Sequence, residues 1–391
     1  MNTVSSIHKE EYGIKAAVTA EAPGRFHLIG EHTSFFKDKT LSMAVNMKVQ
    51  VAVSLRNDQN CKFYFYQLEE KKRVNLSSLK YKKEDKWANA LKAVLYGFTS
   101  GGFELKGMDF TIYSDMLPSA GFGITTAIKV ASAWAVRELL GLKMDDHQLI
   151  QVIERANKLF LKTLNYRADI YSAVYSEENN LVLTDYANSS YQLIPFKLKD
   201  RTVFLTDAKV PRVKTWDEET FMQPENVLLL GELKDRYNNV YGGWKYEENP
   251  TEVNEVLSVV NEDTRRRLLC VMSEHKCILD AVSAIEKQNF GVFARSIKKS
   301  HENMRDLYDN SCPEIDWILK RVYDLDENPQ DMRYPVNCGR ITGKGFGRSL
   351  YAVIRNKDVD KYKEKLDEYQ KIFGFKAETH IVKPAKGVCL L

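Results

Sequence analysis

Small and hydroxyl-bearing residues gather where a phosphate group could bind. The stretch LPSAGFGITTA contains Pro118, Ala120, Gly121 and Gly123, and two threonines follow at the start of a long Ala-rich segment. Small residues let backbone N–H groups approach a ligand, and the first turn of a helix carries partial positive charge and unpaired donors. A plain strand-to-helix turn capped by Thr125 is the alternative. No Gly-Lys-Ser or Gly-Lys-Thr follows, so the stretch is not a Walker loop.

Two other stretches and one carboxylate add candidate chemistry. The stretch APGRFHLIGEHTSFF places Arg25, Glu31 and His32 around a short apolar core. The stretch GRITGKGFGRSLY holds three glycines before an expected strand, where a flexible hairpin turn is the alternative. Asp169 lies in NYRADIYSAVYSEENNLVLTD, and a lone Asp is usually solvated or caps a helix. Taken separately, none of these features identifies a reaction.

The elements that must position these residues follow from local patterns. Apolar residues that alternate or run together with β-branched side chains predict strands, and apolar residues at helical spacing that end at Gly predict helices. The expected strands cover residues 15–21, 43–55, 61–67, 107–116, 179–186, 190–196, 202–208 and 377–387, and another follows the glycine-rich turn within 339–355. The expected helices cover 83–102, 125–143, 145–164 and 359–374, and a helix-rich block runs from about 220 to 325. Strands and helices mix in both halves, which predicts two α/β-type domains, 1–198 and 199–391.

Composition and charge bound the function. The chain has 391 residues and a net charge of +4, so a nucleic-acid or membrane-surface partner is not expected. No apolar run approaches the roughly 20 residues of a membrane span, and the polar N-terminus lacks a signal-peptide core. Six scattered cysteines form no CxxC pair, which favours free thiols in a reducing cytoplasm. We therefore expect a cytoplasmic protein, and the oligomeric state stays open.

Taken together, these stretches resemble galactokinases and the wider GHMP family of small-molecule kinases. APGRFHLIGEHTSFF is similar to the family's sugar-recognition motif, LPSAGFGITTA to its phosphate loop, and GRITGKGFGRSLYAV to its third motif. Asp169 falls where the family has the Asp of a Gly-Ile-Met-Asp-Gln segment, and SHENMRDLYDNSCPEIDWIL resembles a galactokinase helix. All five lie in family order and span nearly the whole chain.

The resemblance implies a two-domain GHMP kinase fold with α/β and α+β parts. The N-terminal domain would resemble ribosomal protein S5 domain two, the C-terminal domain would be ferredoxin-like, and nucleotide and sugar would bind between them. The implied reaction is ATP-dependent phosphorylation of galactose or a related sugar at its anomeric hydroxyl, with Mg²⁺ neutralising the developing charge. The alternative is a catalytically impaired relative that senses sugar or nucleotide and regulates another process.

The resemblance also implies roles for single residues. Asp169 would take the proton from the attacking hydroxyl or orient it, and Arg25 would lie beside Asp169 and hold it ionised. Glu31 and His32 would hydrogen-bond sugar hydroxyls, and Ser34 would stand at a third sugar position.

On the nucleotide side, the resemblance implies that the loop at 118–126 wraps the phosphates. Either Thr125 or Thr126 would face Mg²⁺, because the register of the loop is uncertain by one residue. Trp87 would help to shelter the adenine. Gly343 and Gly345, in the third motif, would pack against the phosphate loop.

Several residues depart from the family pattern at these positions. Ser34 stands where the family has an Asp that clamps two sugar hydroxyls, and His27 replaces the usual Asn. A neutral, shorter side chain at position 34 should weaken the grip on the sugar or admit a different one. Arg167 could pair with Asp169, substrate or phosphate, with an exposed surface residue as the alternative. Lys344 and Arg348 enter a loop that normally holds small residues; we expect them to point to solvent, with phosphate binding as the alternative.

Overall fold

The computed structural model describes most of the chain in two compact units. The described residues are 3–34, 38–116, 121–163, 167–211, 258, 260–326, 333–343 and 348–391. The first unit comprises Met1–Arg25, Ala44–Glu178 and Pro384–Leu391, and the second comprises Phe26–Met43 and Asn179–Lys383. Strands β1 (Val18–Ile29) and β2 (Lys39–Leu55) contribute residues to both units. Because each unit is assembled from discontinuous segments, the contiguous division after residue 198 stays a prediction.

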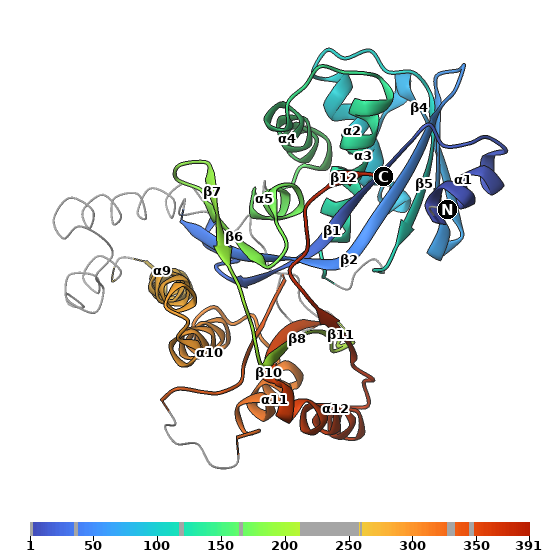
Figure 1. Cartoon of the computed structure of the whole chain (residues 1–391). Coiled ribbons are helices and arrows are strands. Elements are labelled where there is room, and N and C mark those ends of the chain that lie inside the picture. Colours follow the sequence, from blue (N-terminus) through green and yellow to red (C-terminus); the bar gives the residue numbers. More distant parts are fainter. Residues whose placement is uncertain are drawn as a thin grey trace. The chain divides into compact units, whose positions relative to one another are not determined.

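The first unit holds a mixed sheet with the order β12–β1–β2–β5–β3–β4, together with a group of helices (Figure 1). Its further strands are β3 (Asn60–Phe65), β4 (Glu70–Asn75), β5 (Met108–Ser114) and the short β12 (Cys389–Leu390). Its helices are α1 (Thr3–Tyr12), α2 (Ala88–Thr99), α3 (Ile124–Leu139), α4 (Asp146–Arg155) and α5 (Arg167–Tyr175). Strands β3 and β5 pair in parallel, whereas the pairs β2–β5 and β3–β4 are antiparallel.

Helices α3 and α4 show how local sequence builds this unit. The Ala-rich composition of α3 suits a helix, and its residues 126–136 are all buried, so the helix runs through the interior. Helix α4 begins with a capping box in which the Asp145 side chain accepts from the Gln148 N–H and the Gln148 side chain accepts from the Asp145 N–H. It continues into a π-helical turn, η5 (Ala156–Leu161).

The second unit holds an antiparallel four-stranded sheet with the order β11–β8–β10–β9 (Figure 1). The strands are β8 (Arg201–Asp207), β9 (Cys338–Ile341), β10 (Ser349–Arg355) and β11 (Glu378–Val382). Helices α9 (Glu262–Glu286), α10 (Phe290–Asp306), α11 (Pro313–Tyr323) and α12 (Val359–Phe373) contribute to its core. A hairpin of β6 (Asn180–Asp185) and β7 (Ser190–Pro195) pairs with the first residues of β2.

Most of the expected elements are present, and several observed elements were not expected, among them α1, α5, β4 and β12. Strands and helices mix in both units, which confirms the α/β class, and α12 ends at Gly374 in a left-handed conformation. The polar N-terminus forms α1, because Val4, Ile7 and His8 are buried on one face of the helix. Part of the expected helix-rich block, from about 220 to 257 together with 259, lies outside the described residues. All six cysteines are free, and in the described ranges no helix has the length and apolar character that a membrane crossing requires.

Candidate active site

Arg25 and Asp169 form an ion pair in the first unit. The Nη2 atom of Arg25 lies 2.5 Å from Oδ2 of Asp169, and each side chain is 14% exposed. Arg25 comes from β1, and Asp169 comes from the first turn of α5. A guanidinium this close to a carboxylate favours the ionised form of the carboxylate. The structure therefore brings together two residues that are 144 positions apart, in the arrangement that the family resemblance implies.

The loop before α3 is joined to the same arginine. The backbone N–H of Arg25 donates to the carbonyl of Phe122 over 2.8 Å. Gly123, the N-cap of α3, has a φ of 85°, and a Cβ atom there would lie 3.1 Å from Cγ of Arg25. A Cβ atom at Gly24 would lie 2.8 Å from the Phe122 carbonyl oxygen. Two glycines therefore allow β1 to approach the N-terminus of α3 closely.

The two threonines at the start of α3 lie in different environments. Thr125 is exposed, whereas Thr126 is buried at 6% exposure. The first N–H groups of a helix have no intrahelical acceptors, and the N-cap Gly123 has no side chain that could accept from them. The first turn of α3 therefore offers backbone donors and the Thr125 hydroxyl to an anionic ligand. Pro118 and Ala120 lie outside the described residues.

Lys129 is a third charge in this region, and sequence analysis missed it. It is the one ionisable side chain in the buried stretch 126–136 of α3, and its Nζ lies 2.5 Å from Oδ1 of Asn157 in the π-helical turn. Burial lowers the pKa of Lys129 to about 8, Asp169 acts in the opposite direction, and Arg25 adds to the lowering. The sequence signal for a buried charge was a single lysine inside a helical stretch of apolar and small residues.

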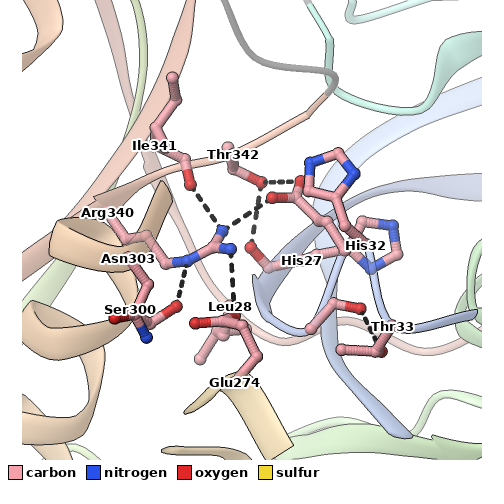
Figure 2. A network of polar contacts seen from close by, with 12 residues as sticks. His27, Leu28, His32, Thr33, Glu274, Ser300, Asn303, Arg340, Ile341 and Thr342 are labelled. Carbon is pink, nitrogen blue, oxygen red and sulfur yellow. Dashed lines mark hydrogen bonds and ion pairs between the residues drawn. The ribbon is translucent and has the colours of Figure 1, made fainter. Parts of the chain in front are cut away.

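A second cluster of charges is buried in the other unit, around Arg340 of β9 (Figure 2). The guanidinium of Arg340 has no exposed surface, and its Nη1 lies 2.7 Å from Oε2 of Glu31. Its Nη2 lies 3.5 Å from Oε2 of Glu274 on α9, and its Nε donates to the Ser300 hydroxyl of α10 over 2.6 Å. Burial alone would lower the pKa of Arg340, but the two carboxylates raise it above its ordinary value.

Glu31 is held by protein groups through both carboxylate oxygens. Its Oε1 accepts from the Thr342 hydroxyl over 3.0 Å and from the backbone N–H of Gly343, and its Oε2 accepts from Arg340. A carboxylate has about four acceptor positions, so about one is left for a further donor. Glu31 of the sugar-recognition stretch therefore anchors the start of the third glycine-rich motif. Gly345 of that motif lies outside the described residues.

His32 and Ser34 follow in the same stretch. The ring of His32 is buried, stacks on Tyr308 with 4.4 Å between the ring centroids, and has its Nε2 3.0 Å from Nδ2 of Asn310. Ser34 is half-buried. Tyr308 and Asn310 contact His32 directly, and Ser300 accepts from Arg340, which in turn binds Glu31. The sequence predicted the segment around residues 300–317 only as a galactokinase-like helix.

Three further residues named from the sequence have protein partners. The buried indole of Trp87 donates its N–H to Glu70 over 2.7 Å. Arg167 pairs with Glu154 over 2.7 Å. Arg348 pairs with Asp207 over 3.1 Å, so the expectation that its side chain points to solvent was wrong. Lys344 lies outside the described residues. Within the described part of the chain, no group of three His, Cys, Asp or Glu residues is arranged to hold a metal ion.

Family models match two parts of the chain. The galactokinase galactose-binding signature matches residues 6–55, and the GHMP kinases N terminal domain matches residues 86–177. The first range contains the sugar-recognition stretch, and the second contains the phosphate-loop stretch.

Relatives and solved structures resemble the chain from end to end. A putative galactokinase of Treponema pallidum is 35% identical over 100% of this chain and 97% of its own length. A galactokinase of Thermotoga maritima is 26% identical over 94% of this chain and 98% of its own. The fold is similar to that of Lactococcus lactis galactokinase complexed with galactose, with a TM-score of 0.84 and 19% identity over 99% of this chain and 98% of that one. Methanococcus jannaschii mevalonate kinase gives a TM-score of 0.63 and 15% identity over 94% and 98% of the two chains. The expected two-domain kinase fold is thereby confirmed.

Proposed function

Because the chain belongs to the galactokinase family and is a galactokinase-like sugar kinase, we propose that it transfers the terminal phosphoryl group of ATP to the anomeric hydroxyl of galactose. The enzyme class, a phosphotransferase with an alcohol acceptor, follows from the family. Nothing in the comparisons supports the sensing or regulatory alternative. The galactose acceptor, the ATP donor, the role of each residue and a cytoplasmic location are parts of this proposal.

The observation that carries the proposal is the Arg25–Asp169 pair at the start of α3. An ionised carboxylate can accept the proton of a sugar hydroxyl, or orient that hydroxyl, as it attacks phosphorus. Arg25 keeps Asp169 ionised and fixes its position through the 2.5 Å contact. The Nε atom of Arg25 is buried and has no acceptor among the described residues. That N–H is therefore available to an oxygen of the transferring phosphoryl group.

The first turn of α3 is the proposed site for the phosphate groups. Backbone donors and the positive end of the helix favour an anion there, and the exposed Thr125 hydroxyl is a hard oxygen ligand of the kind that Mg²⁺ prefers. The buried position of Thr126 favours Thr125 as the metal-facing residue. Bound Mg²⁺ would neutralise charge on the phosphate oxygens. Its other ligands would be phosphate oxygens and water, which fits the lack of a carboxylate cluster in the described ranges.

On the sugar side, we assign Glu31 and His32 to holding the shape of the recognition stretch. Glu31 retains about one acceptor position for a sugar hydroxyl, because protein donors occupy the others. His32 is fixed by its stacking on Tyr308 and its contact with Asn310. Ser34 offers a single neutral hydroxyl in place of a carboxylate, so we propose that it makes a weaker contact with the acceptor.

The test is ATP consumption with Mg²⁺ across a panel of hexoses, for the wild type and Asp169→Asn. We expect turnover with galactose and a loss of about 10²–10⁴-fold in kcat for Asp169→Asn, the range that a proton-transfer group contributes. Asp367→Asn, which changes an exposed carboxylate on α12, is the matched control and should leave kcat unchanged. Full turnover in Asp169→Asn would remove the assigned role, and no turnover with any hexose from folded wild-type protein would refute the proposal.

A further inference from the structure

A cationic cavity lies in the first unit, and no step of the proposed reaction uses it. Its volume is about 670 Å³, and it is lined by Arg56, which follows β2, and by residues of β3, β4, the segment after β4 and α2. Small-molecule sites have volumes of roughly 300–1,000 Å³, so the cavity is of a size that suits such a ligand. Six of its eleven lining residues are cationic and one, Asp85, is anionic; the cationic ones are Arg56, Lys62, Arg73, Lys80, Lys82 and Lys92.

Two of these six cations form ion pairs with carboxylates, and the charge of Lys62 also acts on Asp109. Arg56 lies 2.8 Å from Asp58 and 3.0 Å from Asp109, and the Lys92 ammonium lies 2.7 Å from Asp85. The other four, Lys62, Arg73, Lys80 and Lys82, form no ion pair with any described residue. Like charges gathered around one concave surface raise its positive potential, and an anion bound there would relieve the repulsion.

Hydrogen bonds and an ion pair hold two side chains that line the cavity, Lys92 and Asn75. The side chain of Lys92 is 3% exposed, and its ammonium donates to Asp85 and, over 3.4 Å, to Asn89. Because an ammonium has three N–H donors, one is left without an acceptor among the described residues. Asn75 in the cavity wall is fixed in turn, since its Nδ2 donates to Asn60 over 3.2 Å. The cavity therefore combines a buried cation and fixed amides with four exposed cations.

We propose that this cavity binds a small polyanion that carries two or more phosphate groups. The four cations without an ion pair among the described residues come from separate elements: Lys62 from β3, Arg73 from β4, and Lys80 and Lys82 from the segment that follows β4. One phosphate group presents three or four oxygens at a single point, whereas a phosphate chain can meet cations on several walls at once. The concave shape and limited volume favour a small ligand over a nucleic-acid strand.

The test compares binding of inorganic tripolyphosphate to the wild type, to Arg73→Gln/Lys82→Gln and to Lys106→Gln/Lys143→Gln, by calorimetry at low salt. The two double variants remove the same charge, but Lys106 and Lys143 are exposed residues that do not line the cavity. We expect affinity to fall by about tenfold or more in the cavity variant, to stay unchanged in the control variant, and to weaken as salt is raised.

Two further readouts separate this site from the kinase site and identify the ligand. The KM for ATP should be the same in the cavity variant and the wild type. If the KM for ATP rises in the cavity variant by the same factor by which its affinity for tripolyphosphate falls, the cavity is part of the nucleotide site and the proposal is overturned. Equal losses in both double variants, or no binding, would also overturn it. Tighter binding of cytidine triphosphate than of tripolyphosphate would identify a nucleotide as the ligand; the reverse order would identify the phosphate chain alone.

Discussion

Replacing Lys129 with methionine should make the protein more stable at neutral pH. Lys129 holds a charge inside the buried stretch of α3, and its neighbour Asn157 is a neutral amide. Burial lowers the pKa of its ammonium from 10.5 to about 8. The unfolded chain therefore binds a proton at Lys129 more tightly than the folded chain does, and the charged side chain destabilises the fold at pH 7. Methionine has a similar length and carries no charge, so it removes this cost.

The size of the effect follows from the pKa difference. A pKa that is lower by about 2.5 units corresponds to a destabilisation of about 3 kcal/mol at pH 7. The variant also loses the hydrogen bond to Asn157, which offsets about 1 kcal/mol of the gain. We expect Lys129→Met to gain about 2 kcal/mol at pH 7. Stability of the wild type rises with pH between about 8 and 10.5, because the unfolded chain binds more protons there. The free-energy cost of burying the Lys129 charge should therefore be about half as large at pH 9.5 as at pH 7.

Urea unfolding of the wild type and Lys129→Met at pH 7 and pH 9.5 measures this, with Lys143→Met as the exposed control. We expect kcat to fall in Lys129→Met despite the gain in stability, because the variant removes a charge that interacts with Asp169 and Arg25. The reasoning is refuted if Lys129→Met is less stable than the wild type at pH 7, or if the difference between them does not shrink at pH 9.5.

Three other outcomes are expected. Burial lowers the pKa of His8 from 6.5 to about 4, so the fold favours the neutral imidazole and its stability falls as the pH drops from 6.5 towards 4. Between pH 7.5 and pH 5, the free energy of unfolding in urea should fall by about 2 kcal/mol more for the wild type than for His8→Gln. Equal decreases in the two proteins would contradict this. Thr125→Ala should raise KM for MgATP with little change in melting temperature, whereas Thr126→Ala should lower the melting temperature; the opposite pattern would reassign the metal-facing residue. Ser34→Asp should shift acceptor preference towards galactose in the hexose panel, and an unchanged profile would place position 34 away from the sugar.

The sequence alone determined the class of fold and the two residues of the Arg25–Asp169 ion pair. Strand and helix patterns depend on neighbours within a few positions, so the Ala-rich run of α3 and the Gly stop of α12 could be predicted locally. The motifs also occur in family order, and the family resemblance implies that Arg25 lies beside Asp169. The roles of Thr125 and Ser34 remain predictions for the kinetic experiments above.

Only the tertiary structure decided which side chains are buried and what holds them. Glu31 and Arg340 are 309 residues apart, and His32 and Asn310 are 278 apart, so no local pattern predicts either contact. The family resemblance implies that Glu31 hydrogen-bonds a sugar hydroxyl, and packing in the second unit supplies its carboxylate with three protein donors. Lys129 likewise acquires its lowered pKa only because the helix around it is buried. Burial and electrostatic environment depend on elements that meet only when the chain folds, which is why sequence spacing could not supply them.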